Sequence, residues 1–90
     1  MYKLKFTPTF EGDFKKLDRH IAKNILAKIY WLSENLEQTK IENVAFVPRG
    51  LKGLKKYRIG DWRIFFWLDN KDKMIILYGI EHRKSAYKNF

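Results

Sequence analysis

Residues 54–68, LKKYRIGDWRIFFWL, decide the fold of this 90-residue chain. Basic and apolar residues alternate over positions 56–59, which predicts a strand at 54–59. Gly60 and Asp61 then predict a turn or a bulge. The aromatic run at 62–68 is apolar on both faces, which indicates a strand in the middle of a sheet. We therefore expect two successive strands of one sheet in this stretch.

The sequence on either side predicts further strands and two helices. Residues 2–7 alternate with period two, while residues 8–17 and 19–37 carry apolar side chains at helical spacing. Thr7 and Asp18 are residue types that cap the start of a helix. The remaining predicted elements are a short strand at 43–48, a hairpin turn at 69–72 and a last strand at 73–80.

Together these elements predict an α+β fold. We expect a strand and a two-helix hairpin, followed by an antiparallel meander of three or four strands, in the order β-α-α-β-β-β. Amphipathic helices must bury their apolar stripes, so we expect both helices to pack on one face of the sheet. Ninety residues form a single domain, residues 1–90, with little room for a second core.

The charge of the chain favours an anionic partner. Nineteen Lys and Arg residues against ten Asp and Glu residues give a net charge of +9, which suits nucleic acid, an acidic protein segment or anionic lipid. A membrane role is the least favoured of these, because the sequence contains no apolar span of 18 residues and no signal-peptide pattern. We therefore expect a cytoplasmic protein.

Metal and cofactor chemistry have little support in the sequence. The chain has no cysteine, which excludes disulfides and thiolate ligands. Its two histidines are isolated and lack the spacing of a zinc motif. We expect neither a metal nor a cofactor.

Basic residues gather on the predicted strands. By alternation, Lys56 and Arg58 share one face of their strand, opposite Tyr57 and Ile59. Arg63 lies within the aromatic strand, where an arginine is either paired or faces a polar concavity. Each residue also has a purely structural interpretation. Arg63 could form an ion pair with Glu81, and Lys56 and Arg58 could simply lie on the solvated face of their strand.

The end of the chain, GIEHRKSAYKNF at 79–90, adds further candidates. Arg83 and Tyr87 follow the last strand, and we expect them to converge with the strand cations on one patch. Arginine and lysine suit phosphate oxygens, and a tyrosine ring suits a stacked base. His82 on its own is more often a hydrogen-bonded structural residue than a catalyst.

Such a patch is suited to RNA cleavage without a metal. A ribose 2′-oxygen attacks the adjacent phosphate, so the site must accept a proton, stabilise charge on phosphorus and protonate the leaving oxygen. Neighbouring positive charges favour the neutral form of a lysine, which is the form that accepts a proton.

LKKYRIGDWRIFF followed by IILYGIEHRKSAY resembles the RelE toxins of the RelE/ParE superfamily, and the likeness runs through the whole chain in order. The resemblance implies a RelE-like fold and a toxin of a type II toxin–antitoxin system. It also implies an endoribonuclease that enters the ribosomal A site and cuts the bound mRNA codon. The implied partners are the ribosome, mRNA and a cognate antitoxin, in a higher hetero-oligomer of toxin and antitoxin.

The resemblance also implies roles for individual residues. Lys56 and Arg58 match the paired basic positions of the family strand, which supply the base and stabilise charge. Arg63 would hold the scissile phosphate, Arg83 would aid transition-state charge or protonation of the leaving group, and Tyr87 would stack on or orient the base.

One departure from the family pattern affects the proton transfer. Arg58 stands where the best-studied pattern has a lysine, and an arginine hardly deprotonates. The expected base is therefore Lys56, or the acid–base work passes to His82 or Tyr87.

Two other functions remain open. Within the superfamily, a ParE-like protein inhibits DNA gyrase by binding it, which needs no cluster of this kind. A non-catalytic RNA-binding module, or a decayed toxin, would keep the fold and the charge. Alternation also leaves open whether the large aromatic residues of the central strand are core or are exposed for an antitoxin, namely Trp62, Phe65 and Trp67.

Overall fold

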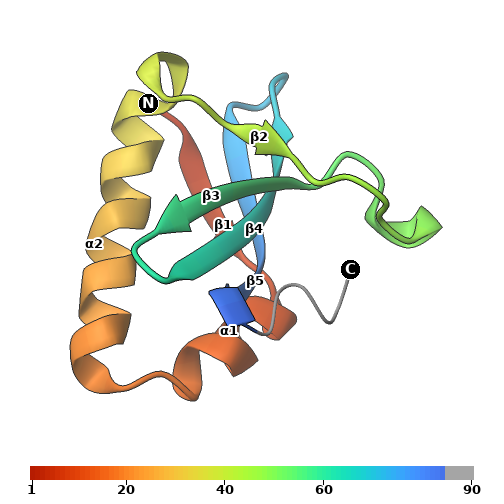
Figure 1. The fold of residues 1–90 in the computed structure, drawn as a ribbon. Helices are drawn as coiled ribbons and strands as arrows, with labels where there is room; N and C mark the ends of the chain where they lie inside the picture. Colours follow the sequence, from red (N-terminus) through yellow and green to blue (C-terminus); the bar gives the residue numbers. More distant parts are fainter. Residues whose placement is uncertain (85–90) are drawn as a thin grey trace.

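The computed structural model describes residues 1–84 and has the expected α+β architecture (Figure 1). A first strand and two helices precede four antiparallel strands of one five-stranded sheet, whose order is β1-β5-β4-β3-β2. The elements are β1 (Lys3–Phe6), α1 (Pro8–Lys15), α2 (Arg19–Asn35), η1 (Leu36–Gln38), β2 (Glu42–Asn43), η2 (Arg49–Leu51), β3 (Lys55–Ile59), β4 (Trp62–Asp69) and β5 (Met74–His82).

Both helices begin where the sequence predicted. The Thr7 hydroxyl accepts a hydrogen bond from the Phe10 amide at 3.2 Å, and Pro8 occupies the first helical position, where its missing N–H is not needed. Asp18 holds the N-cap position of α2. The predicted helix at 19–37 ends earlier, at Asn35, and its last turn is the 3-10 helix η1. No helix within residues 1–84 is long and apolar enough to cross a bilayer.

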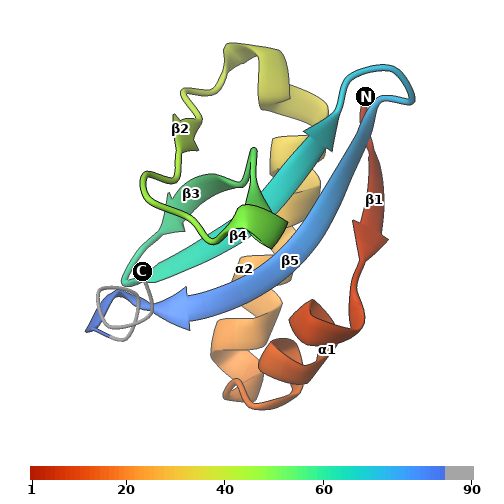
Figure 2. The same ribbon diagram turned by 90° about the vertical axis from the view of Figure 1, so that its right-hand side faces the viewer.

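The main core lies between α2 and one face of the sheet. Figure 2 shows α2 behind the sheet and η2 in front of it. Trp62 is partly buried and packs against this core, which answers one of the questions that alternation left open. The fully or nearly buried side chains at its centre are Ile25, Ile29 and Leu32 from α2 and Ile64, Phe66, Ile75, Leu77 and Ile80 from the sheet.

A second, smaller cluster covers one end of the opposite face. Phe65 is 3% exposed and packs with Leu54, and Trp67 is partly buried beside them. The loop of residues 44–54 supplies the cover, through Val44 and Val47 together with Leu51. The sheet therefore has an apolar face toward α2 and a divided face on the other side.

The prediction of a strand at 43–48 is wrong. β2 consists of Glu42 and Asn43 alone, and Val44 and Val47 turn down onto the second cluster. Phe46 has a backbone φ of 55°, a left-handed conformation that an extended strand cannot contain. After Asn43 the chain leaves the sheet, and its two valines pack on the cluster of Leu54 and Phe65.

A bulge interrupts the pairing of β4 with β5. Phe65 lies opposite Gly79 whereas Phe66 lies opposite Leu77, so Tyr78 is an extra residue on β5. Leu77 and Ile80 both reach the core beside α2 although they are three positions apart. Alternation along β5 is therefore shifted by one residue after the bulge.

Asp13 of α1 fixes the bulge. Its Oδ2 accepts a hydrogen bond of 3.0 Å from the amide of Ile80. Gly79 leaves room for this carboxylate, because a Cβ at that position would lie 3.1 Å from the same oxygen. The amide beyond the bulge is thus satisfied by a side chain rather than by a neighbouring strand.

We predict that Asp13→Ala lowers the free energy of unfolding by about 1.5–3 kcal/mol, the range for a hydrogen bond to a charged group. Asp13→Asn keeps a carbonyl acceptor and should lose less. Urea unfolding followed by tryptophan fluorescence measures both changes. Glu34→Ala, which removes an exposed carboxylate from α2, is the matched control, and a loss for Asp13→Ala no larger than the control's would contradict the prediction.

Candidate functional site

Three candidate cations lie on the sheet face turned away from α2. Tyr57 and Ile59 pack on the α2 side, so Lys56 and Arg58 point to the other side of β3. Arg63 stands between Trp62 and Ile64, both in the α2-side core, and therefore also points away from it. The face that alternation predicted for Lys56 and Arg58 is confirmed.

The strand register brings two of these residues into one row. Arg58 pairs with Arg63 across β3 and β4, and Arg63 pairs with Glu81 across β4 and β5. Residues directly opposite in antiparallel strands have Cβ atoms about 4.5–5.5 Å apart. We call Arg58, Arg63 and Glu81 the charged row.

Lys56 lies one step along the face from the charged row. It pairs with Phe65, which belongs to the second cluster, and Phe65 pairs with Gly79. The ammonium group therefore stands at the border between the apolar part of this face and its charged part. A lysine in that position is partly shielded from water, and its side chain is half-buried.

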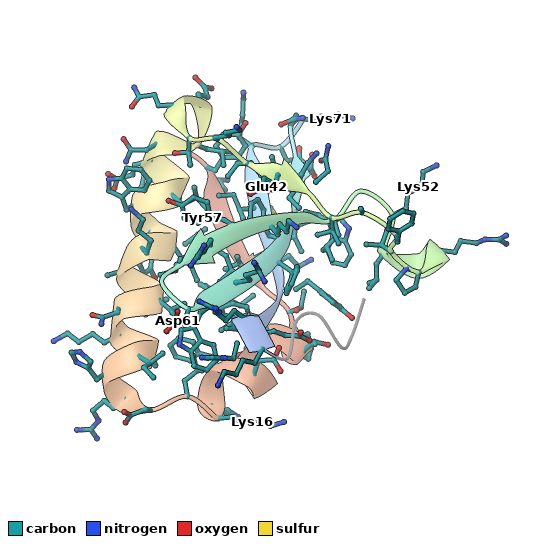
Figure 3. The ribbon with its side chains drawn as sticks, viewed as in Figure 1. Lys16, Glu42, Lys52, Tyr57, Asp61 and Lys71 are labelled. Atoms are coloured by element: carbon teal, nitrogen blue, oxygen red, sulfur yellow. The ribbon has the colours of Figure 1, made fainter. Side chains whose placement is uncertain are left out.

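The turn between β3 and β4 holds Arg58 and Arg83. The Arg58 Nε donates to the Gly60 carbonyl at 2.9 Å, and the Arg83 amide donates to the Asp61 carbonyl at 2.8 Å. The Arg83 guanidinium also approaches the Asp61 carboxylate at 3.7 Å, but the two side chains are 56% and 63% exposed, so this ion pair is weak. Figure 3 shows Asp61 at this turn, close to the end of the charged row.

His82 is separated from the other candidates. It pairs with Trp62 in the strand register and lies edge-on to that indole, with ring centroids 5.0 Å apart. It lines a hollow of about 270 Å³ with Asp13 and Leu17 on the helix side of the sheet, and its Nδ1 accepts from the Lys84 amide at 3.3 Å. The structure thus places His82 on the Trp62 side of the sheet, opposite Arg58 and Arg63. Tyr87 lies outside the described residues.

The charged row places two like charges in facing positions of neighbouring strands. Like charges directly opposite one another destabilise a pair of strands, and Arg58 faces Arg63. Glu81 stands on the other side of Arg63, as the ion-pair reading of the sequence anticipated, and it supplies one negative charge against two positive ones. An arrangement that violates a local stability rule is typical of a functional site.

The sequence reading passed over the loop that borders this face. Residues 44–60 contain five cations and no carboxylate. Arg49 and Lys52 of this loop are exposed, and the one-sided charge of the segment was the signal that could have drawn attention to them. Within residues 1–84 no group of three or more histidine or acidic side chains is placed to hold a metal ion.

Comparison with known proteins identifies the family. Residues 4–87 match the family described as the ParE toxin of the type II toxin–antitoxin system parDE. A comparison with curated protein sequences found no match.

Solved structures share the fold. The toxin–antitoxin complex RelBE2 from Mycobacterium tuberculosis has a TM-score of 0.75 at 23% identity, covering 91% of this chain and 98% of that chain. The RelB–RelE complex from Methanococcus jannaschii has a TM-score of 0.69 at 25% identity, with coverages of 96% and 98%. The isolated E. coli RelE toxin has a TM-score of 0.68 at 15% identity, with coverages of 98% and 93%.

The family match spans nearly the whole chain, and the fold agrees with that of the RelE structures. The chain therefore belongs to this toxin family, and it is a toxin of the RelE/ParE superfamily of type II toxin–antitoxin systems.

Proposed function

We propose that this toxin is a ribosome-dependent, metal-independent endoribonuclease that cleaves mRNA codons in the ribosomal A site and so inhibits translation. The observation that carries the proposal is the row in which Arg58 faces Arg63 across two strands, with Lys56 one step away on the same face. Inhibition of a protein by binding alone does not need clustered cations at this place, whereas a phosphate in its transition state is stabilised by them.

The proposed reaction is attack of the ribose 2′-oxygen on the adjacent phosphorus. The new P–O bond forms as the bond to the 5′-oxygen breaks, which leaves a 2′,3′-cyclic phosphate and a 5′-hydroxyl. Arg63 and Arg58 would each donate to a non-bridging phosphate oxygen, where negative charge increases in the transition state. Arg83, beside the same turn, would stabilise the leaving oxygen.

Lys56 is the residue that we assign to accept the 2′-hydroxyl proton. Arg58 cannot serve, because a guanidinium stays protonated, and His82 faces the helix side of the sheet. The 5′-oxygen must gain a proton as it leaves, and we assign this proton to a water molecule that Arg83 orders, because a guanidinium hardly deprotonates. Tyr87 keeps its proposed role of stacking on the substrate base.

The partners in this proposal are the ribosome with its bound mRNA and a cognate antitoxin, and the compartment is the cytoplasm. The RelBE2 and RelB–RelE structures are toxin–antitoxin complexes. An antitoxin that covers the charged row would place its carboxylates against Arg58 and Arg63 and exclude RNA. We expect such a complex to be a higher hetero-oligomer.

A ParE-like inhibitor of DNA gyrase is the second candidate. The observation that favours it is the family match, which carries the description of a ParE toxin. The fold is shared across the superfamily and does not separate the two activities. The cluster of cations on one face is the feature that the gyrase reading leaves without a role. A non-catalytic RNA-binding module would use these cations for binding alone.

Expression of the toxin in cells, with mRNA 5′ ends mapped by primer extension, tests the proposal. We expect codon-phased cuts that fall by about 100-fold in Arg58→Ala and in Arg63→Ala, because each removes a donor to the transition state. Arg19→Ala removes an exposed arginine at the start of α2 and should cut as the parent does. Growth arrest with intact mRNA and a DNA-damage response would favour the gyrase reading, and no arrest would favour a non-catalytic module.

The assignment of the base predicts a contrast between Lys56→Arg and His82→Gln. Lys56→Arg keeps the positive charge but removes the amine, so cleavage on programmed ribosomes should slow by about 100-fold or more, the range for a general base. His82→Gln should leave the single-turnover rate nearly unchanged. A loss in His82→Gln together with full activity in Lys56→Arg would show that the proton moves through the other residue.

A further inference from the structure

Phe46 is the most exposed large apolar side chain in the described part of the protein. It is 95% exposed, whereas the exposed aromatic residues of α2, Tyr30 and Trp31, are 51% and 43% exposed. Its φ of 55° lies in the left-handed region, which a bulky residue rarely adopts. The chain therefore holds a phenyl ring in water on a strained backbone, and this combination is typical of a ligand contact.

The position of Phe46 results from a firmly attached loop. Val44 and Val47 on either side pack onto Leu54 and Phe65, and the Val44 amide donates to the Leu54 carbonyl at 3.1 Å. The Trp67 indole donates to the Lys52 carbonyl at 3.2 Å. Burial of the flanking residues fixes both ends of the segment, so the ring between them is held away from the cluster.

The charge around Phe46 indicates what it contacts. Arg49 and Lys52 are exposed on the same loop, and no carboxylate occurs between residues 44 and 60. Figure 3 shows Lys52 on the loop, pointing away from the sheet and from α2. An aromatic ring suits the face of a base and the cations suit the flanking phosphates, so single-stranded RNA fits both features.

We propose that Phe46 stacks on an unpaired RNA base and that Arg49 and Lys52 hold the phosphates beside it. The loop lies on the same side of the sheet as the charged row, the side away from α2 (Figure 2). This second RNA contact rests on the proposed function and extends it, because it fixes substrate RNA at a distance from the bond that is cut.

Fluorescence anisotropy with a labelled single-stranded RNA tests the stacking contact. The RNA carries 2′-O-methyl riboses throughout, which removes the nucleophile, so binding is measured without cleavage. Phe46→Ala should bind about tenfold more weakly, within the range for loss of one stacked base. Phe46→Trp should retain the affinity, and Phe46→Leu, which is apolar but has no ring, should resemble Phe46→Ala. Tyr30→Ala, an exposed aromatic on α2, is the control and should bind as the parent does.

The salt dependence of binding tests the two cations. Replacing both in Arg49→Gln/Lys52→Gln should reduce the slope of log affinity against log salt by about 1.4, since each phosphate contact to a single strand contributes about 0.7. Phe46→Ala should leave this slope unchanged. An unchanged slope in the double variant would overturn the phosphate contacts.

Three results would overturn the stacking contact. The first is unchanged RNA affinity in Phe46→Ala, and the second is full RNA affinity in Phe46→Leu. The third is a Phe46→Ala variant that keeps its RNA affinity but binds the cognate antitoxin more weakly, which would show that Phe46 contacts the antitoxin and not RNA. Failure of the proposed function is distinguishable, because intact mRNA in cells together with Phe46-dependent RNA binding would reject cleavage and support the loop contact. Codon-phased cuts together with RNA binding that does not depend on Phe46 would support cleavage and reject the loop contact.

Discussion

The hydrogen bond from the Ile80 amide to the Asp13 carboxylate connects α1 to the bulge in β5. A shift of one residue in a strand moves every following side chain to the other face of the sheet. With unbroken alternation from Leu77, Glu81 would point toward α2 and His82 would join Arg58 and Arg63. The bulge reverses this, so that Glu81 faces Arg63 and His82 packs on Trp62. The half-buried carboxylate of Asp13 thus holds the bulge that sets which end-of-strand residues reach the charged row.

This constraint also explains what the sequence could predict. Period-two patterns are local, and they correctly placed Lys56 and Arg58 opposite Tyr57 and Ile59. The separation of His82 from these cations depends on the bulge, and the bulge is held by a residue 67 positions earlier in the chain. Gly79 is a local sign of a bulge, but nothing in residues 73–80 indicates that Asp13 is the partner. The fold class follows from long periodic segments, and it was predicted correctly. The side of the sheet to which Glu81 and His82 point depends on one distant hydrogen bond, and it was not predicted.

The two ends of the divided sheet face have opposite effects on stability. Burial of Phe65 beneath Val44 and Val47 stabilises one end, and the other end carries Arg58 against Arg63 at a cost in stability. The strand predicted at 43–48 failed for the same reason. Valine is a residue type that favours strands, but Val44 and Val47 pack onto the face of the sheet and do not extend its edge. The loop that results encloses the apolar half and leaves the cationic half open to an anionic partner.

The position of β5 has a consequence for how the protein assembles. The last strand lies between β4 and β1, and β1 pairs with it in parallel, Lys3 opposite Met74. Contacts between such distant segments form late in folding, since a long loop must close first. A chain whose synthesis has not reached residue 74 lacks the strand that joins the two parts of the sheet. The charged row also needs β5 for Glu81, so the complete face forms only after Glu81 has been translated.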